Sequence, residues 1–373
     1  MERIHIPLAE PDITEADIDA VAGVLKTSHL ALGPKLTAFE DAVAQYVGVR
    51  HAVAVNGGTS ALHLIIRALG LGPGDEVITT PFSFIASTNC ILMEGATPVF
   101  GDIKPQTLCI DPARIEAAIT PRTRAILAVD VFGHPADWTQ LEKIAKKHDL
   151  VLIEDSAESL GSRLNGTSCG SFGRAAIFGF YPNKQITTGE GGMVVTDDRE
   201  LAERCRSMSN QGVSDGGWLS YERLGYNYRM DEMSAALGNS QMGRIEEIVA
   251  ARAQVANWYM DALKVIDGIV LPRVADNVRM SWFVFVIQLA ETFSREDRDE
   301  TISALQARGI GCRDYFQPIH LQPFIQEQLG TKRGDFPITE AIGDRTIALP
   351  FFPQMTREQI RTVAEALKLS IPR

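Results

Sequence analysis

The sequence predicts an α/β fold with a mainly parallel central sheet. Between about residues 50 and 210, short apolar runs alternate with segments of helical periodicity, as they do when crossover helices join parallel strands. Several helical segments start at a residue suited to capping a helix, which places their beginnings. From about residue 246 the alternation changes to a mixed pattern, which indicates a second and smaller α/β domain.

The first helix is predicted to begin after Thr14, a capping residue followed by an acidic first turn and an apolar series that starts at Ile18. Seven apolar runs are the predicted strands of the sheet: residues 51–55, 76–80, 97–100, 124–130, 150–154, 175–180 and 192–196. The helix after the first strand ends at Gly70. Another helix begins at 111–112, where a capping aspartate precedes a proline at the first helical position.

Asp231 is predicted to cap one long helix with apolar positions at Leu237, Met242, Ile245, Ile248 and Val249. Three more elements are predicted after it: a strand at 282–287, a helix near 297–308 and a final helix at 356–368. We therefore divide the chain into a large domain, residues 1–245, and a small C-terminal domain, residues 246–373. The N-terminal helix is expected to pack against the small domain.

Composition and charge exclude several classes of protein. The net charge of −11 disfavours non-specific binding to nucleic acid, which depends on basic side chains. No apolar run approaches the ~18 residues that span a membrane, and the N-terminus lacks the pattern of a signal peptide, so a cytoplasmic location is predicted. The five cysteines are scattered and form no CxxC pair, so we expect neither disulfides nor a metal site.

Two residues, Asp155 and Lys184, point to a cofactor. Asp155 ends an apolar run, where parallel α/β sheets bind their ligands, although a lone aspartate there would more often cap the next helix. Lys184 lies between an aromatic and proline stretch and the segment TTGEGG, an unusual setting for a solvated charge. A lysine that forms a Schiff base and a carboxylate that keeps a pyridine nitrogen protonated are what pyridoxal 5'-phosphate (PLP) chemistry requires. The pair therefore predicts a PLP enzyme.

Residues 51–70 form a predicted strand, a glycine turn and a helix. Free N–H groups at such a helix start, together with the hydroxyls of Thr59 and Ser60, are suited to binding a phosphate. This signal is weak by itself because every α/β protein needs turns of this kind. The glycine-rich stretch 70–74 follows a helix and precedes a strand, the reverse of a dinucleotide-binding turn, so we interpret it as a connection.

Several segments, taken together, closely resemble the sugar aminotransferases of the DegT/DnrJ/EryC1/StrS family. They are GTSAL at 58–62, residues 81–87, residues 154–162, PNKQITTGEGG at 182–192 and GYNYRM at 225–230. The resemblance extends from about residue 5 to the C-terminus. It implies a type I PLP-dependent transferase fold with a seven-stranded sheet, and a homodimer with shared active sites. TTGEGG, GYNYRM and the stretch 315–320 are most similar to perosamine synthases, which aminate C4 of a nucleotide-linked 4-keto-6-deoxy sugar such as GDP-4-keto-6-deoxymannose.

By this resemblance Lys184 forms the Schiff base and Asp155 is the partner of the pyridine nitrogen. Gly58, Thr59 and Ser60 would hold the phosphate of PLP. L-glutamate would be the amino donor, and a nucleotide sugar of surface polysaccharide or glycoconjugate biosynthesis the acceptor.

Three further cofactor contacts are implied by the resemblance. Phe84 would stack on the ring, and Glu158 would lie near the 3-hydroxyl group. Asn227 would reach the phosphate of the neighbouring subunit, so each site would need both chains. Gly179 departs from the family pattern, because most relatives have there a serine that binds the phosphate.

The contacts to the substrates are predicted from the same resemblance. Tyr315 and His320 fall in a segment that contacts the sugar in relatives, although a lone histidine is as often structural. Arg229 and Arg313 are candidates for an anionic group of a substrate, since a guanidinium suits carboxylates and phosphates, but a surface salt bridge explains each of them as well.

Other functions remain open at this stage. Members of the family that aminate 3-keto sugars or cyclitols share most of these motifs. Sugar dehydratases of the same fold replace the lysine with histidine, and a regulatory DNA-binding role would require a basic surface, so both agree less well with the sequence. A nicotinamide-dependent oxidoreductase would need GxGxxG after the first strand.

Overall fold

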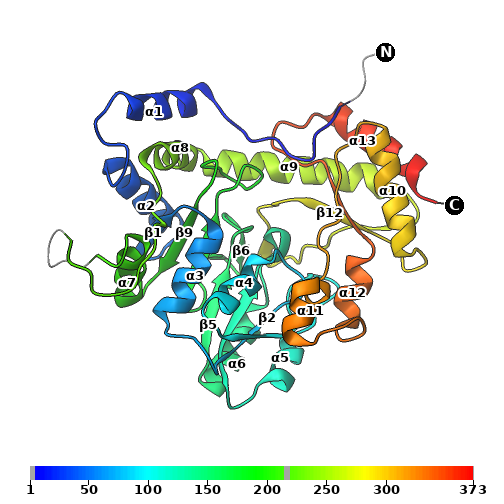
Figure 1. Ribbon diagram of the computed structural model, residues 1–373. Coiled ribbons are helices and arrows are strands. Elements are labelled where there is room, and N and C mark those ends of the chain that lie inside the picture. The colour runs from blue at the N-terminus through cyan, green and yellow to red at the C-terminus, as the bar shows by residue number, and fades with distance from the viewer. Residues whose placement is uncertain (1–4, 214–218, 373) are drawn as a thin grey trace.

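The computed structural model describes residues 5–213 and 219–372. Its centre is a seven-stranded sheet with the order β1-β9-β8-β5-β4-β2-β3 (Figure 1). The strands are β1 (His51–Val55), β2 (Glu76–Thr79), β3 (Thr97–Phe100), β4 (Thr123–Val129), β5 (Val151–Asp155), β8 (Ala175–Gly179) and β9 (Gly192–Thr196). All seven predicted strands are confirmed, each to within one residue at either end.

The sheet is parallel from β8 to β3, whereas β9 pairs antiparallel with both β1 and β8. Along β1, Val53 and Val55 belong to one hydrophobic core, and Ala52 and Ala54 belong to another. Alternate residues of a strand point to opposite faces, so a sheet with a core on each face needs strands that are apolar throughout. This is why the strands stand out in the sequence as continuous apolar runs.

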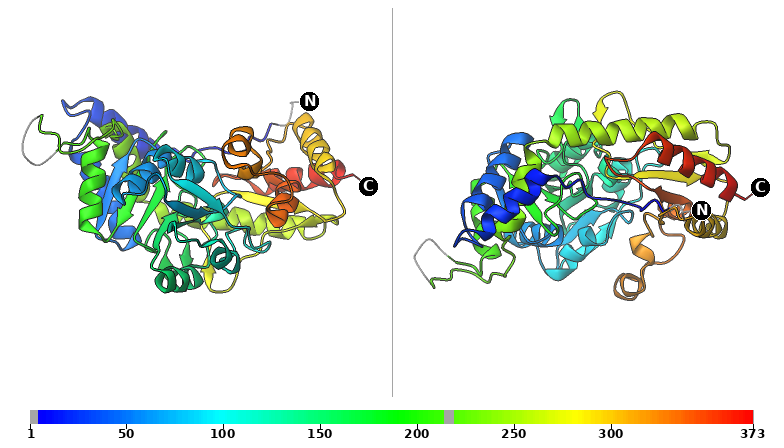
Figure 2. Two further views of the ribbon diagram at one scale, coloured as in Figure 1. Left: turned by 60° about the horizontal axis from the view of Figure 1, so that its bottom comes forward. Right: turned by 90° about the horizontal axis from the view of Figure 1, so that it is seen from above.

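Helices pack against both faces of the sheet. Side chains of α2 (Pro34–Val47) pack into one core and side chains of α3 (Gly58–Ala68) into the other, so the sheet is covered on both faces (Figure 2). The remaining helices of this part are α4 (Ala86–Met93), α5 (Pro112–Ala118), α6 (Trp138–His148), α7 (Arg199–Ser209) and the 3₁₀ turn η1 (Val131–Gly133). The predicted cap at Asp111 is confirmed, since its carboxylate accepts the Ala113 N–H at 3.1 Å.

The prediction of a single long helix after Asp231 is wrong. Asp231 caps α8 (Glu232–Met242), and a separate helix, α9 (Ile245–Leu263), begins after a break at Gly243 and Arg244. Glycine is a poor helix former, and the Arg244 backbone leaves the helical region with φ of −126° and ψ of 20°. The break turns the Arg244 guanidinium toward Asp12 and Asp17, with which it forms ion pairs.

The predicted packing of the N-terminal helix is also wrong. Helix α1 (Glu15–Leu25), which begins at the predicted Thr14 cap, packs against α8 instead of the C-terminal part. The buried Asp17 carboxylate on α1 accepts the Ser240 hydroxyl of α8 at 2.6 Å, which fixes this contact. The segment before α1 is what reaches the C-terminal part, where Ile6 forms a bridge with Ile310.

The C-terminal part contains a second sheet in the order β10-β12-β13, formed by β10 (Ile269–Val270), β12 (Phe285–Leu289) and β13 (Thr346–Leu349). The strand predicted at 282–287 starts only at Phe285, because Trp282 has a left-handed φ of 55°, which an extended strand excludes. Helices α10 (Arg295–Ala307) and α13 (Arg357–Ser370) confirm two predicted helices. The remaining elements are β6 (Arg163–Leu164), β7 (Thr167–Ser168), β11 (Val278–Arg279), η2 (Ile319–Leu321), α11 (Pro323–Leu329) and α12 (Pro337–Gly343).

Helix α9 runs from the side of α8 toward α13 and so links the central sheet to the C-terminal sheet (Figure 1). The domain division at residues 245 and 246 coincides with the start of this helix and stays a prediction. Within the described residues, every helix is too short or too polar to cross a membrane.

Candidate active site

A pocket of about 650 Å³ opens at the C-terminal ends of the central strands. Val129 ends β4, Asp155 ends β5 and Gly179 ends β8, and all three residues line the pocket. Lys184 lines it as well, and Tyr315 contributes to the wall from the C-terminal part. The fold therefore brings the two residues that predicted a cofactor into one site, at the edge where open α/β sheets bind ligands.

Asp155 is 5% exposed and accepts the Ala157 N–H at 3.2 Å. Burial is the largest cause that raises the pKa of Asp155 to about 7; Glu158 also raises it, while the Ala157 hydrogen bond and the Lys184 amine lower it. A carboxylate so buried needs an N–H or cationic partner to remain charged. The protonated ring nitrogen of PLP is such a partner, so this residue fits the predicted cofactor.

The Lys184 amine faces into the same pocket. Its Nζ lies 3.3 Å from Glu158 Oε1 and 3.8 Å from the centre of the Phe283 ring. The lysine follows β8 on a turn that is closed by a hydrogen bond from the Lys184 N–H to the Tyr181 carbonyl, at 2.9 Å. The side chain is thus held between a carboxylate and an aromatic face, and only 14% of it is exposed.

The start of α3 forms another wall of the pocket. Gly57 occupies the cap position without a capping side chain, and Gly58 and Thr59 line the pocket. Unbonded N–H groups at a helix start attract an anion, so this wall fits the phosphate of PLP. A Cβ on Gly192 would lie 2.5 Å from the Gly57 carbonyl oxygen, so only glycine allows the hairpin after Lys184 to close on this turn.

Glu158 links the lysine to the opposite wall. Its Oε2 accepts the Phe132 N–H at 2.9 Å. Phe132 follows β4 with a left-handed φ of 59°, and its ring centre lies 5.1 Å from that of Phe316 and 6.4 Å from that of Tyr315. One carboxylate therefore orients both the lysine amine and the aromatic wall that the C-terminal part presents to the pocket.

A buried polar network holds the loop that carries Asp155 and Glu158. Asp130 accepts the hydroxyls of Ser156 and Ser159 at 2.8 and 2.9 Å, and Glu154 lies 2.6 Å from the same Ser156 hydroxyl. That hydroxyl has one proton, so it donates fully to only one of the two carboxyl groups at a time. Burial and the charge of Asp130 raise the pKa of Glu154 well above its usual range.

Several predicted site residues lie outside the pocket lining: Ser60, Asn227, Arg229, Arg313 and His320. The Ser60 hydroxyl donates to Asn56 Oδ1 at 2.7 Å. Asn227 is exposed, and Arg229 donates to Asn210 Oδ1 at 2.8 Å. Phe84 does line the pocket and is 61% exposed, so it stands at the entrance. Of these residues, only Phe84 contributes to the pocket within one chain.

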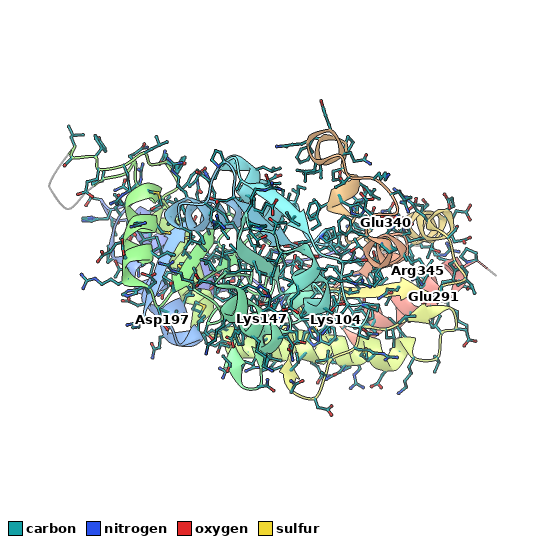
Figure 3. The ribbon with its side chains drawn as sticks, turned by 90° about the horizontal axis from the view of Figure 1, so that it is seen from below. Lys104, Lys147, Asp197, Glu291, Glu340 and Arg345 are labelled. Atoms are coloured by element: carbon teal, nitrogen blue, oxygen red, sulfur yellow. The ribbon has the colours of Figure 1, made fainter. Side chains whose placement is uncertain are left out.

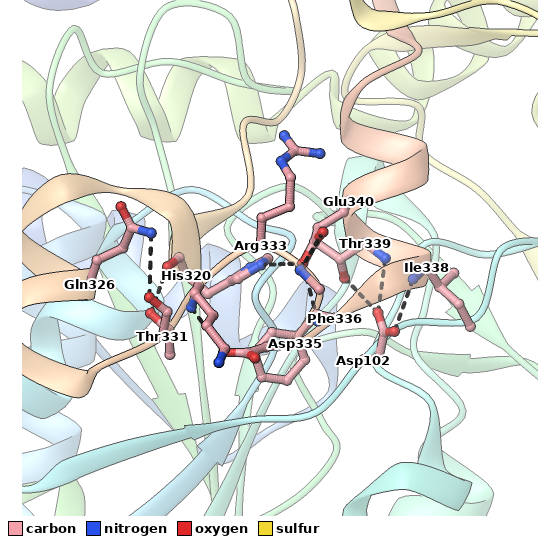
Figure 4. A network of polar contacts seen from close by, with 12 residues as sticks. Asp102, His320, Gln326, Thr331, Arg333, Asp335, Phe336, Ile338, Thr339 and Glu340 are labelled. Atoms are coloured by element: carbon pink, nitrogen blue, oxygen red, sulfur yellow. Dashed lines mark hydrogen bonds and ion pairs between the residues drawn. The ribbon is translucent and has the colours of Figure 1, made fainter.

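His320 is completely buried and lies outside the pocket lining. It belongs to a network of polar contacts in the C-terminal part (Figure 4). Its Nε2 lies 2.9 Å from Glu340 Oε1, and its carbonyl accepts the Thr331 hydroxyl at 2.6 Å. Burial lowers the pKa of His320, and Glu340 acts in the opposite direction. Glu340 lies toward the same end of the molecule as Arg345 (Figure 3). Within one chain, His320 therefore holds the C-terminal part together, and its contact with a sugar stays a prediction. Arg313 is exposed at the surface.

Comparison with known proteins agrees with this site. Residues 11–368 match the DegT/DnrJ/EryC1/StrS aminotransferase family. The chain belongs to this family. Family members are PLP-dependent aminotransferases, so the predicted family, enzyme class and cofactor are confirmed.

Relatives in this family match nearly the full length. The spore coat polysaccharide biosynthesis protein SpsC of Bacillus subtilis is 39% identical over 98% of this chain and 97% of its own. A GDP-perosamine synthase of Caulobacter vibrioides is 39% identical, with 97% of each chain covered. A UDP-N-acetyl-3-dehydro-alpha-D-glucosamine 3-aminotransferase of Acidithiobacillus ferrooxidans is 37% identical over 99% of this chain and 96% of its own. The relatives thus include enzymes named for different amino sugars.

Solved structures of aminotransferases have the same fold. S. venezuelae DesV superposes with a TM-score of 0.90 at 38% identity, over 96% of this chain and 94% of its own. The PLP form of the sugar aminotransferase Spr1654 of Streptococcus pneumoniae, described as putative, superposes with a TM-score of 0.94 at 29% identity, over 98% of both chains. The predicted transferase fold is therefore confirmed.

Several residues of this site were not identified from the sequence. Phe132 and Phe283 stand in apolar stretches that look like ordinary core, so no signal marks them. Arg252 does carry a signal, because it interrupts the buried face of α9 between Ile248 and Val255 at helical spacing. Its guanidinium donates to the Lys184 carbonyl oxygen at 2.6 Å, which no sequence pattern specifies.

Proposed function

We propose that this aminotransferase moves an amino group from L-glutamate to C4 of a nucleotide-linked 4-keto-6-deoxy sugar, as a perosamine synthase does. The observation that carries the proposal is the single pocket in which Lys184 Nζ, Glu158, Asp155 and the uncapped start of α3 meet. Relatives named GDP-perosamine synthase, at 39% and 36% identity, support this choice of sugar.

PLP, when bound, supplies an electron sink that makes the protons on the amine-bearing carbon of the donor acidic. Lys184 is the residue that we expect to attach the cofactor. Once its Nζ is free, the amine is the base that takes the proton from the donor carbon and later returns it. Glu158 Oε1, at 3.3 Å, keeps this amine in place.

The other residues bind and orient. We propose that Asp155 accepts the N–H of the ring nitrogen and keeps its proton there, and that the N–H groups of Gly58 and Thr59 bind the phosphate. Tyr315 and Phe84 form apolar walls that exclude water from the reacting atoms. Gly179 has no hydroxyl to offer to the phosphate, so the start of α3 carries more of this binding than in most relatives.

We further propose a cytoplasmic homodimer with shared sites. Asn227 is exposed and lies outside the lining of its own pocket, which suits a residue that completes the pocket of a partner subunit. Exposed apolar side chains also lie near it in the chain, at Leu224, and on either side of Ala31, which forms a bridge with Asp231, at Leu30 and Leu32.

A spectral screen tests the choice of sugar. The enzyme is converted to its pyridoxamine form with L-glutamate and then mixed with a panel of nucleotide-linked keto sugars. We expect the absorbance of the PLP form to return fastest with GDP-4-keto-6-deoxymannose. Amination of 3-keto sugars is the second candidate, favoured by the 3-aminotransferase relative at 37% identity. A faster return with a 3-keto sugar would replace the first proposal with the second.

A further inference from the structure

Arg252 lies inside the protein, next to Lys184. It is 2% exposed and projects from the middle of α9, the helix that runs from α8 toward α13 in Figure 1. Among the described residues, its guanidinium donates hydrogen bonds only to main-chain carbonyl oxygens: those of Lys184 at 2.6 Å, Trp282 and Phe283 at 3.2 Å each, and Asn183 at 3.4 Å. Its Cζ also lies 5.8 Å from the centre of the Phe351 ring.

This arrangement is unusual for a buried arginine, which normally meets a carboxylate. Burial lowers the pKa of Arg252 to about 10, and its Nε has no hydrogen-bond partner. An apolar side chain of similar size would often serve stability as well as a buried charge does. The arginine is therefore best explained by what its guanidinium holds.

The guanidinium joins two segments of the active site. Nη2 binds the Asn183 and Lys184 carbonyls, and Nη1 binds the Trp282 and Phe283 carbonyls. The ring of Phe283 is the one whose centre lies 3.8 Å from Lys184 Nζ. Trp282 has a left-handed φ of 55°, a conformation that a bulky residue keeps only when its surroundings fix it. One rigid planar group, the Arg252 guanidinium, thus binds both the main chain of Lys184 and the segment that places the Phe283 ring against the Lys184 amine.

We propose that Arg252 is a positioning residue for the Lys184 amine. It fixes the lysine main chain and the Phe283 ring relative to each other, so that Nζ stays beside Glu158 in the pocket that would hold the cofactor. The inference rests on the proposal that Lys184 carries the cofactor. A lysine at position 252 cannot replace the arginine, because an ammonium is a point charge without the planar fork that spans both segments.

The test compares Arg252→Lys and Arg252→Met with a matched pair, Arg298→Lys and Arg298→Met. Arg298 is 1% exposed and also binds main-chain carbonyls, those of Gly343 at 3.0 Å and Thr346 at 3.4 Å, while its Nε pairs with the Asp299 carboxylate. It lies on α10 and outside the pocket lining. The control pair therefore disturbs a buried guanidinium without disturbing the lysine.

Three quantities are measured for each variant. The first is the visible circular dichroism of the bound cofactor, which reports how the lysine holds it. The second is the rate at which an amine reagent labels Lys184 in cofactor-free protein, followed by peptide mass spectrometry. The third is kcat and KM for L-glutamate. We expect both Arg252 variants to change the dichroism and the labelling rate and to lower kcat roughly 100-fold with a much smaller change in KM, as misplaced catalytic groups do. The Arg298 variants should lower only the melting temperature.

Three results would overturn the inference. The first is an Arg252→Lys enzyme with wild-type values throughout, and the second is an equal effect in the Arg298 pair. The third is failure of both Arg252 variants to fold while the Arg298 pair folds, which would make Arg252 a requirement of folding. Borohydride reduction of the same samples separates the two proposals. A label on another lysine removes the role of Lys184 and this inference together, whereas a label on Lys184 with unchanged dichroism removes this inference alone.

Discussion

Replacing Asp155 with asparagine tests the electrostatics of the site most directly. Burial raises the pKa of Asp155 from its ordinary value of 3.8 to about 7. At about 1.4 kcal/mol per pKa unit, the charged form costs about 4 kcal/mol in the cofactor-free pocket. The protonated ring nitrogen must offset most of this cost if the carboxylate is to stay charged beside it.

Asp155→Asn removes that charge and keeps the shape of the side chain. Electrostatic contributions of this kind are worth about 3 kcal/mol or more in the transition state, which corresponds to a loss of at least about two orders of magnitude in rate. We expect this loss in the half-reaction with L-glutamate, measured by stopped-flow absorbance in a single turnover. The cofactor should still attach to Lys184.

Asp102→Asn is the matched control. Asp102 is 8% exposed and accepts the N–H groups of Ile338 and Thr339 at 3.0 and 2.9 Å, outside the pocket lining (Figure 4). Its replacement should lower the melting temperature and leave the half-reaction within about threefold of wild type, since distant sites act independently. An Asp155→Asn enzyme that binds PLP and reacts within tenfold of wild type would show that the carboxylate has a different role.

Three further predictions follow from the same site. Borohydride reduction of the purified yellow protein should fix the cofactor on Lys184, and peptide mass spectrometry that finds it on another lysine would contradict the assignment. Mixing inactive Lys184→Ala and Asn227→Asp chains should regenerate activity, because one of the two sites in a mixed dimer carries neither change. Confirmed subunit exchange without a gain in activity would refute the shared site. Normal PLP binding by Asn227→Asp alone would also refute it. Without the cofactor, Asp155 binds its proton more tightly in the folded than in the unfolded protein, so its contribution to stability is present below pH 3.8 and is lost as the pH rises through about 7. The unfolding free energy of the wild type relative to Asp155→Asn should therefore fall by up to about 4 kcal/mol over that pH range, and saturation with PLP should remove this trend. Denaturant titrations that give a constant difference in unfolding free energy would exclude the raised pKa.

The large sheet could be predicted from the sequence because its strands are buried on both faces. Each of them is a continuous apolar run with polar or glycine residues at its ends, and such runs are local features of the chain. Asp155 and Lys184 stood out for a related reason: a charged residue at the end of an apolar run, or beside a glycine hairpin, contradicts its local surroundings.

The errors lie where contacts between distant residues decide the structure. The helix after Asp231 breaks at Gly243 and Arg244, and there the Arg244 side chain meets Asp12 and Asp17, which are more than 200 positions away in the sequence. The N-terminal helix packs on α8 because Asp17 and Ser240 bond to each other. No periodicity within either segment records these partners.

The sequence by itself determined the order of the strands along the chain, the caps of most helices and the pair of residues that indicates PLP. Only the tertiary structure decided which side chains surround that pair. Glu158 reaches the lysine amine from the loop after β5, Phe283 covers it from the C-terminal part, and Arg252 holds both segments from α9. Hydrophobic periodicity specifies which face of an element is buried, whereas the meeting of three elements at one amine depends on how those faces pack, and that information is distributed over the whole chain.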